Sequence, residues 1–293
     1  MKKKFYVTAI ILVLTLTICL CVGCNLFDKD NTPQKYFVEI GQVEDSRVAS
    51  IVANNTLASC VRISANFPSI NKSSKSSGFF VTSDGYVITN RHCVVRFTNG
   101  DDLPSGNEEP IRAEYVVMDA QGNSYGAKLV SYSKTVDVAL LKVVPNVLDT
   151  LIGATMNFKP LTFDTESEPY YGDRLYTIGN PENMGFILSE FMVASPGIKL
   201  SSNAEHYSII LDGNVNHGNS GGALIDVNSH VVGLIYARVK SPSNTTTVNP
   251  DEDAGTYGLG CAIPAKVVTE FLDECEIEYS KYTPTTSEDT PEA

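Results

Sequence analysis

Hydrophobic and polar positions along most of this chain fall into short runs that are typical of β-strands. The runs are five to nine residues long, rich in Val, Ile, Tyr and Phe, and bounded by Gly, Asn, Asp and Ser. They predict strands at residues 60–64, 78–82, 86–90, 114–119, 138–143, 174–179, 207–212, 223–227 and 231–239. Because no long helical pattern separates these strands, the sequence predicts an all-β barrel or sandwich.

Two helical patterns flank the strands. The first opens the domain with apolar residues at helical spacing, namely Val48, Ile51, Val52 and Leu57. The second predicts a C-terminal helix over residues 265–275. The polar stretch at 98–110 reads as a surface loop, and the polar, Pro-containing residues 276–293 predict a disordered tail.

The first residues have the pattern of an export signal. Three lysines at 2–4 precede an apolar stretch at 5–22 that ends at Gly23 and Cys24. Gly23 and Cys24 resemble the cleavage box of bacterial lipoproteins, although Cys21 stands where Leu is usual. We expect a lipoprotein-type signal peptide at 1–23, a lipidated Cys24 and a tether at 24–42. An uncleaved transmembrane anchor is the alternative, and both readings place the domain outside the cytoplasm, at the membrane of a bacterial cell surface.

Composition narrows the partners of the chain. Its 34 acidic and 22 basic residues give a net charge of −12, which argues against nucleic acid. Four cysteines remain outside the signal region, at positions 60, 93, 261 and 275, and they form no C-x-x-C pair. We therefore expect no metal and no cofactor, while any disulfide pairing stays open.

The strongest local motif surrounds Ser220, in the sequence HGNSGG at 217–222. Glycines on both sides of a serine permit backbone angles that expose its hydroxyl. Backbone amides of Gly218, Asn219 and Ser220 then form a candidate oxyanion hole. The alternative is a plain glycine-rich turn. The motif also fits the G-x-S-x-G elbow of α/β-hydrolases, but those enzymes place the histidine last in the chain order, on a sheet with crossover helices, and this chain does not fit that order.

Two further residues complete a candidate catalytic triad. His92 follows a predicted strand, where the chain would run into a short turn. Asp137 is a lone acid directly before an apolar strand, where it can be buried against an imidazole and fix its tautomer. We assign no catalytic role to His206, His217 or His230.

Together these segments resemble the chymotrypsin-like serine proteases, and more closely their HtrA (DegP-like) branch. The resemblance covers about residues 48–272 and rests on SGFFVTSDGYVITNRHCVV, NSYGAKLVSYSKTVDVALLKV and LDGNVNHGNSGGALID, in the order His, Asp, Ser. It implies two six-stranded antiparallel β-barrels with the site between them. His92 would act as general base and acid, Asp137 as its orienting group, and Ser220 as the nucleophile.

The resemblance also implies boundaries and a specificity pocket. The protease domain would span 43–275, with one barrel at about 58–160, a second at about 161–264, and then the C-terminal helix. Too few residues follow the helix for a PDZ domain. Substrate-binding residues would be Asn214, Ile235 and Tyr236, which predict a small or medium uncharged P1 residue rather than Lys or Arg.

The sequence therefore predicts a membrane-tethered serine endopeptidase that cleaves exported or unfolded proteins and peptides. Two alternatives remain: a gated or non-proteolytic binding protein with chaperone-like activity, and an esterase that uses the same site. Relatives of the HtrA type often form homotrimers, so a homotrimer is carried over as an expectation.

Overall fold

The computed structural model describes residues 47–104, 108–145, 156–200, 204–213, 215–240 and 256–284. The expected signal peptide, tether and lipidated Cys24 lie outside these residues. In the described part of the chain, no helix is both long and apolar enough to cross a membrane.

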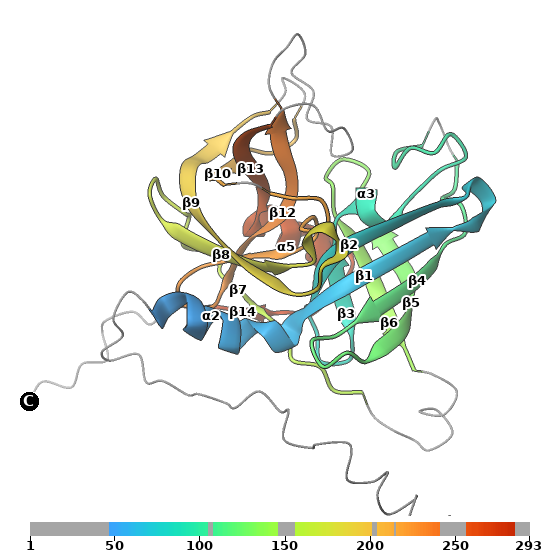
Figure 1. Ribbon diagram of the computed structural model, residues 1–293, viewed down its shortest axis with the longest axis horizontal. Helices are drawn as coiled ribbons and strands as arrows, with labels where there is room; N and C mark the ends of the chain where they lie inside the picture. Colours follow the sequence, from blue (N-terminus) through green and yellow to red (C-terminus); the bar gives the residue numbers. More distant parts are fainter. Residues whose placement is uncertain are drawn as a thin grey trace, which may run out of the picture. The chain divides into compact units, whose positions relative to one another are not determined.

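The first half of the described chain closes into a barrel (Figure 1). Its six strands are β1 (Cys60–Phe67), β2 (Lys72–Phe80), β3 (Tyr86–Thr89), β4 (Glu114–Met118), β5 (Ser124–Tyr132) and β6 (Ala139–Val144). They pair in the order β1-β2-β3-β6-β5-β4, and β4 returns to β1, where Ile63 lies opposite Val117. Each pairing in this ring is antiparallel.

The second half closes a second ring of six strands. They are β8 (Arg174–Gly179), β9 (Ile187–Ile198), β10 (Ser208–Asp212), β11 (Ala223–Ile225), β12 (Val231–Lys240) and β13 (Thr256–Pro264). Antiparallel pairing of β11 with β12 closes the ring, with Ala223 opposite Leu234. The prediction of two six-stranded antiparallel barrels is confirmed, and β7 (Thr162–Phe163) is added to β12 in parallel.

Alternating side chains divide the core into distinct apolar clusters. In β2, Phe79 belongs to an apolar cluster that also contains residues of the second barrel, whereas Phe80 faces the inside of the first barrel. A separate cluster, which includes Leu211 and Leu224, fills the second barrel. Because the cluster around Phe79 is shared, the two barrels pack against each other as one hydrophobic body.

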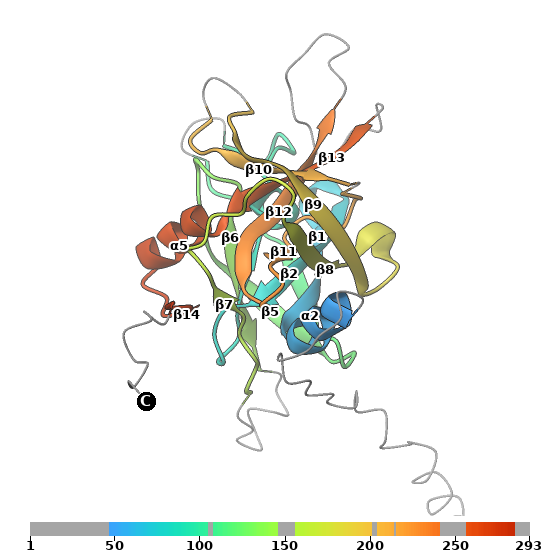
Figure 2. The ribbon, with the colours of Figure 1, turned by 90° about the vertical axis from the view of Figure 1, so that its left-hand side faces the viewer.

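Three helices frame the barrels. The predicted opening helix is α2 (Val48–Thr56), and α3 (Arg91–Val94) is a single short turn after β3. The predicted C-terminal helix is α5 (Ala265–Glu274), one residue shorter than expected because Cys275 caps it. Figure 2 shows α5 against the second barrel, where Val268, Phe271 and Leu272 are buried.

The segment after α5 corrects one expectation. Residues 276–284 are not disordered, because Ser280–Lys281 form β14, which pairs in parallel with β7. The backbone N–H of Tyr282 donates to the carbonyl of Phe163 at 2.8 Å, and the ring of Tyr279 packs edge-on against Phe163 at 5.5 Å. The start of the disordered tail was therefore predicted too early. Residues 276–284 are polar, and the strand among them forms through backbone hydrogen bonds to β7, which composition does not indicate.

Candidate active site

His92 lies in α3, at the edge of the first barrel. β3 ends at Thr89, the extended Asn90 follows it, and the chain then turns once, so that His92 lies just after the end of a strand. Its side chain is only 12% exposed. The backbone of His92 is therefore held by the closed barrel, and burial restricts its side chain.

Asp137 holds this imidazole through two hydrogen bonds. Its Oδ2 lies 2.6 Å from His92 Nδ1, and its Oδ1 accepts the backbone N–H of His92 at 2.9 Å. A carboxylate only accepts, so Nδ1 carries the proton and Nε2 is left as the basic nitrogen. This is the tautomer that a general base requires.

The pair also shifts the ionisation of both groups. Burial opposes a charged imidazole, but the charge and hydrogen bond of Asp137, with a contribution from Cys93, outweigh it and raise the pKa of His92 well above 6.5. Burial likewise opposes a charged carboxylate, yet His92 and Arg91 bring the pKa of Asp137 below 3.8. Each group thus stabilises the charged form of the other.

Sequence reasoning missed the residues that position Asp137. Arg91 is buried, and its Nη1 donates to the carbonyls of Ser133 and Val136 at 2.8 Å each. Asn90 donates from Nδ2 to the carbonyl of Asp137 at 2.8 Å. Asn90, Arg91 and His92 are thus consecutive residues of one turn. The first two bind the loop that carries Asp137, and Asp137 in turn binds His92. The sequence offers no signal for these contacts beyond the adjacency of Arg91 to His92.

Ser220 lies between β10 and β11, on the second barrel, across from His92. Its Oγ donates a long hydrogen bond to the carbonyl of Tyr236 at 3.5 Å. Among the described residues, no hydrogen bond joins Ser220 Oγ to His92. The basic nitrogen instead has Cys93 Sγ as a hydrogen-bonding neighbour, 3.5 Å from His92 Nε2. The structure thus brings the three predicted residues together with the hydroxyl turned away from the base.

One cavity of about 530 Å³ contains the meeting point of these groups. His92, Cys93, His217, Gly218 and Ser220 line it, so His217 faces the site even though the sequence analysis gave it no role. The cavity continues along the polar half of β2 and the loop after α3. It leaves room for a peptide on one side of Ser220.

Glycine is required at two positions of the loop around Ser220. Gly218 (φ +94°) and Gly221 (φ +84°) both have left-handed backbone, and an added Cβ would lie 2.1 Å from Asn180 O or 2.2 Å from Ser77 O. Within the described part of the chain, the amides of Gly218 and Ser220 have no hydrogen-bond partner. The Asn219 amide donates to Asn216 O at 3.1 Å, which leaves two of the three predicted amides available for an oxyanion.

Ser77 links this loop to the first barrel. Its hydroxyl donates to Gly218 O at 2.6 Å and accepts the backbone N–H of Asn180 at 2.8 Å. Its own backbone N–H donates to Ser220 O at 2.9 Å. The sequence did not predict this role, because Ser77 belongs to the polar run that precedes the predicted strand at 78–82.

The three predicted substrate-binding residues lie in different environments. Asn214 lies outside the described residues. The Ile235 side chain is fully buried in the core of the second barrel, while its backbone pairs with Gly221 and Gly222 at 2.8 and 2.9 Å. Tyr236 is partly buried, and its hydroxyl lies 2.9 Å from Ser208 Oγ. Burial raises the pKa of the Tyr236 phenol, which stays neutral.

The four cysteines are free thiols in this structure. Cys60, Cys93 and Cys261 are buried and Cys275 is partly buried. Burial raises the pKa of the Cys60 and Cys261 thiols to about 12. These two thiols are therefore unreactive core residues.

Comparison with known proteins places this geometry in context. The model of a family described as trypsin-like peptidase domain matches residues 76–234. The chain is 29% identical over 200 residues to the serine endoprotease DegS of Salmonella typhimurium, covering 68% of this chain and 47% of DegS. It is also 29% identical over 198 residues to a probable periplasmic serine endoprotease, DegP-like, of Bartonella henselae, covering 68% of this chain and 32% of that protein.

A solved structure shares the fold. The structure of the HtrA-type protease AlgW with tripeptide superposes with a TM-score of 0.58 at 24% identity, covering 77% of this chain and 62% of AlgW. The chain thus spans about a third to a half of the curated relatives it matches. These matches confirm the resemblance expected from the sequence motifs.

Proposed function

Because the chain belongs to the family of trypsin-like peptidase domains, we propose that it is a serine endopeptidase of the HtrA type. The observation that carries this proposal is the bond of 2.6 Å from His92 Nδ1 to Asp137 Oδ2, in a cavity shared with Ser220. Its substrates are exported proteins, unfolded ones included, and their peptides.

The residues of the cavity account for each step of peptide hydrolysis. Ser220 rotates from the Tyr236 carbonyl toward His92, and its Oγ attacks the scissile carbonyl carbon while His92 Nε2 takes the proton. Asp137 stabilises the imidazolium, and the amides of Gly218 and Ser220 stabilise the oxyanion. His92 then protonates the leaving amine, and water hydrolyses the acyl-enzyme by the same route.

A gated form of this enzyme is the second candidate. Ser220 Oγ donates to Tyr236 O, and Cys93 Sγ lies beside the basic nitrogen that Ser220 must reach. A resting enzyme of this kind needs substrate or a partner to rotate the serine. Hydrogen bonds in ligand-free sites are often long, so this geometry is compatible with ordinary activity as well.

The location and assembly belong to the same proposal. Support for an extracytoplasmic protein comes from the signal-like first residues and from the relative named as periplasmic. We propose a lipid anchor at Cys24, a protease domain at 43–275, a small or medium uncharged P1 residue, and a homotrimer.

Cleavage of unfolded casein by the full chain tests the function, with Ser220→Ala as the inactive variant. We expect wild-type cleavage and a loss of several orders of magnitude in the variant. A fluorophosphonate probe should label Ser220 in wild type only. Labelling without casein cleavage would favour the gated form or an esterase, and small ester substrates separate these two. A folded wild type with neither activity would overturn the proposal.

A further inference from the structure

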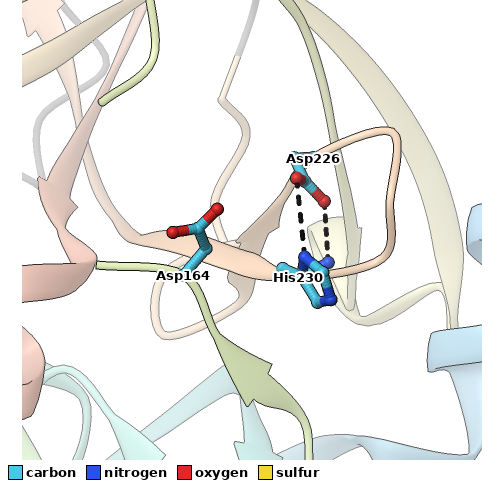
Figure 3. A group of neighbouring side chains, drawn as sticks. All are labelled: Asp164, Asp226 and His230. Atoms are coloured by element: carbon cyan, nitrogen blue, oxygen red, sulfur yellow. Dashed lines mark hydrogen bonds and ion pairs between the residues drawn. The ribbon is translucent and has the colours of Figure 1, made fainter. Parts of the chain in front are cut away.

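Three potential metal ligands meet on the second barrel, in a cluster separate from the residues proposed to be catalytic. Asp164 follows β7, whereas Asp226 and His230 flank the turn between β11 and β12 (Figure 3). One ligand atom from each lies within 4.8 Å of the other two. The cluster combines two carboxylates with one imidazole, and Asp164 is almost fully buried.

Backbone amides fix one oxygen of each carboxylate. Asp164 Oδ1 accepts the N–H groups of Glu166 and Ser167, both at 2.9 Å. Asp226 Oδ1 accepts those of Asn228 and His230, at 2.9 and 2.7 Å. Each carboxylate is therefore held in one orientation, while its Oδ2 is not used by the backbone.

The imidazole of His230 contributes an unsatisfied atom. Its Nδ1 is buried and has no hydrogen-bond partner. It lies 3.9 Å from Asp226 Oδ2, too far for a hydrogen bond. The ring stacks on Tyr282 at 4.5 Å, which restricts the plane of the imidazole. A buried nitrogen without a partner costs free energy, and a ligand that it can bind would recover that cost.

A turn of the same kind in the first barrel shows what is unusual here. Asp119 accepts the amides of Gln121 and Asn123 on Oδ1, both at 2.9 Å. Its Oδ2, however, also accepts Asn123 Nδ2 at 2.8 Å and the hydroxyl of Tyr125 at 3.0 Å. Within the described residues, Asp226 Oδ2 accepts a single hydrogen bond, from Asn228 Nδ2 at 3.3 Å. The turn of Asp119 is thus complete, whereas that of Asp226 leaves acceptor capacity facing His230.

We propose that Asp164, Asp226 and His230 bind one divalent transition-metal ion, with zinc as the best match to this nitrogen and oxygen donor set. The ligands of a tetrahedral zinc ion lie about 2.1 Å from the metal and thus roughly 3.4 Å apart. Small side-chain rotations close the present spacing to that distance. Water completes the coordination.

The surroundings favour a cation. The buried carboxylate of Asp164 lies within 4.8 Å of a ligand atom of Asp226 and of His230, so it can face a shared cation. Asp164 also lines a cavity of about 510 Å³, and Asp226 lines another of about 220 Å³. These cavities provide a path for the ion from solvent.

Metal binding would join three parts of the second barrel. The ion would connect the segment after β7 to the β11–β12 turn, and the stack of His230 on Tyr282 would extend the connection to β14. The ion would therefore be structural, and its effect would be on the stability of the C-terminal segment.

Zinc titration of the chelator-treated full chain by isothermal titration calorimetry tests the proposal, with Asp164→Asn, Asp226→Asn and His230→Phe as variants. Asn still accepts the turn amides, and Phe retains a ring to stack on Tyr282, so these variants keep the local fold. We expect about one zinc bound per wild-type chain, a Tm increase of about 2–8 °C, and at least about tenfold weaker binding in each variant.

Asp119→Asn is the matched control, because it changes the same turn chemistry without a neighbouring histidine. It should bind zinc as wild type does. Zinc should also slow proteolysis within residues 276–284 in wild type and in this control. Equal zinc affinity in wild type and all three ligand variants, or no binding by wild type, would overturn the proposal, and neither result depends on peptidase activity.

Discussion

The two barrels contribute to the active site in different ways. On the first barrel, His92 and Asp137 are joined by two short hydrogen bonds, and Arg91 and Asn90 hold the loop that carries the acid. On the second, the Ser220 hydroxyl makes one hydrogen bond within the described residues, of 3.5 Å to Tyr236 O, and the buried Asn219 Oδ1 beside it has no partner among them. The proposed base and its acid are pre-organised, whereas the proposed nucleophile is adjustable.

This difference separates two energetic tasks. Ionising a buried pair requires fixed dipoles around it, and the first barrel supplies them from a closed sheet. Presenting a hydroxyl requires only rotation about one bond, and glycines give the loop the backbone angles that exposure needs. We therefore expect variants that disturb the His92–Asp137 pair or its supports to change catalysis and stability together. Variants that disturb the loop around Ser220, including its anchor Ser77, should change mainly the rate.

The largest effect should follow from Asp137→Asn. The amide can no longer hold Nδ1 as the protonated nitrogen, so we expect kcat for peptide cleavage to fall about 10⁴-fold near neutral pH. Steady-state cleavage of a fluorogenic peptide measures it. Asp84→Asn, on the exposed turn between β2 and β3, is the control and should retain wild-type rates. A loss of less than tenfold in Asp137→Asn would contradict the assigned role of this residue.

Arg91→Met should lower the stability of the first barrel. Met retains the apolar stem but leaves the carbonyls of Ser133 and Val136 without their donor, so the free energy of unfolding should fall by about 2–4 kcal/mol. Denaturation in urea measures this change. Arg174→Met is the control on the second barrel, where an exposed pair with Glu190 at 3.7 Å should contribute less than about 1 kcal/mol. Equal decreases in the free energy of unfolding of the two variants would contradict the role of Arg91 in stabilising the first barrel.

Ser77→Ala should change the rate more than the stability. It removes the hydroxyl that holds Gly218 O and Asn180 N, and we expect kcat/KM to fall about 10- to 100-fold, since small displacements of catalytic groups have effects of this size. Ser76 is the matched control, because its buried Oγ has no hydrogen-bond partner. Ser76→Ala should leave kcat/KM unchanged. A Ser77→Ala enzyme with normal kcat/KM would show that the loop holds its shape without this bond.

The pH dependence should show the smallest effect. His92 acts as a base only when neutral, so its raised pKa predicts that kcat/KM increases with pH through a midpoint above 6.5. Cys93 contributes to that shift, so Cys93→Ala should move the midpoint toward 6.5 while the plateau rate changes less than about tenfold. A peptide-cleavage pH profile measures both, and an unchanged midpoint would exclude Cys93 from this role.

The shifted pKa values of His92 and Asp137 also make the stability of the fold depend on pH. For His92, this dependence is opposite in direction to that of the activity. The contribution from His92 is fully present below pH 6.5 and is lost as pH rises through its raised folded pKa. The contribution from Asp137 is present above pH 3.8 and is lost as pH falls through its lowered folded pKa. On the alkaline side, activity should therefore rise while this part of the stability declines.

Sequence patterns predicted the apolar strands well but not the polar ones. The strand at β9, Ile187–Ile198, alternates between the two faces but contains Pro196 and Gly197, which mask the signal. The first six of the nine residues of β2 are KSSKSS, and they form a strand through their pairing with β1. Both segments form strands because they pair with the backbone of neighbouring strands, and this pairing cannot be seen in the local sequence.

The site shows the same division. Motifs around His92, Asp137 and Ser220 predicted three candidate residues, because each motif is local to a few positions in the sequence. Arg91 and Ser77 were missed because their partners lie 42 to 141 residues away along the chain. Such contacts follow from how the two barrels dock, and no spacing in the sequence encodes them.

The hydrogen bonds of Ser77 have a consequence for folding kinetics. They join residues 141 positions apart, between barrels that can each close through their own pairings. Secondary structure should therefore form on refolding before the nucleophile loop is fixed against the first barrel, because docking follows ring closure. An active-site label on Ser220 would then report the last event of refolding, later than the recovery of β-sheet signal.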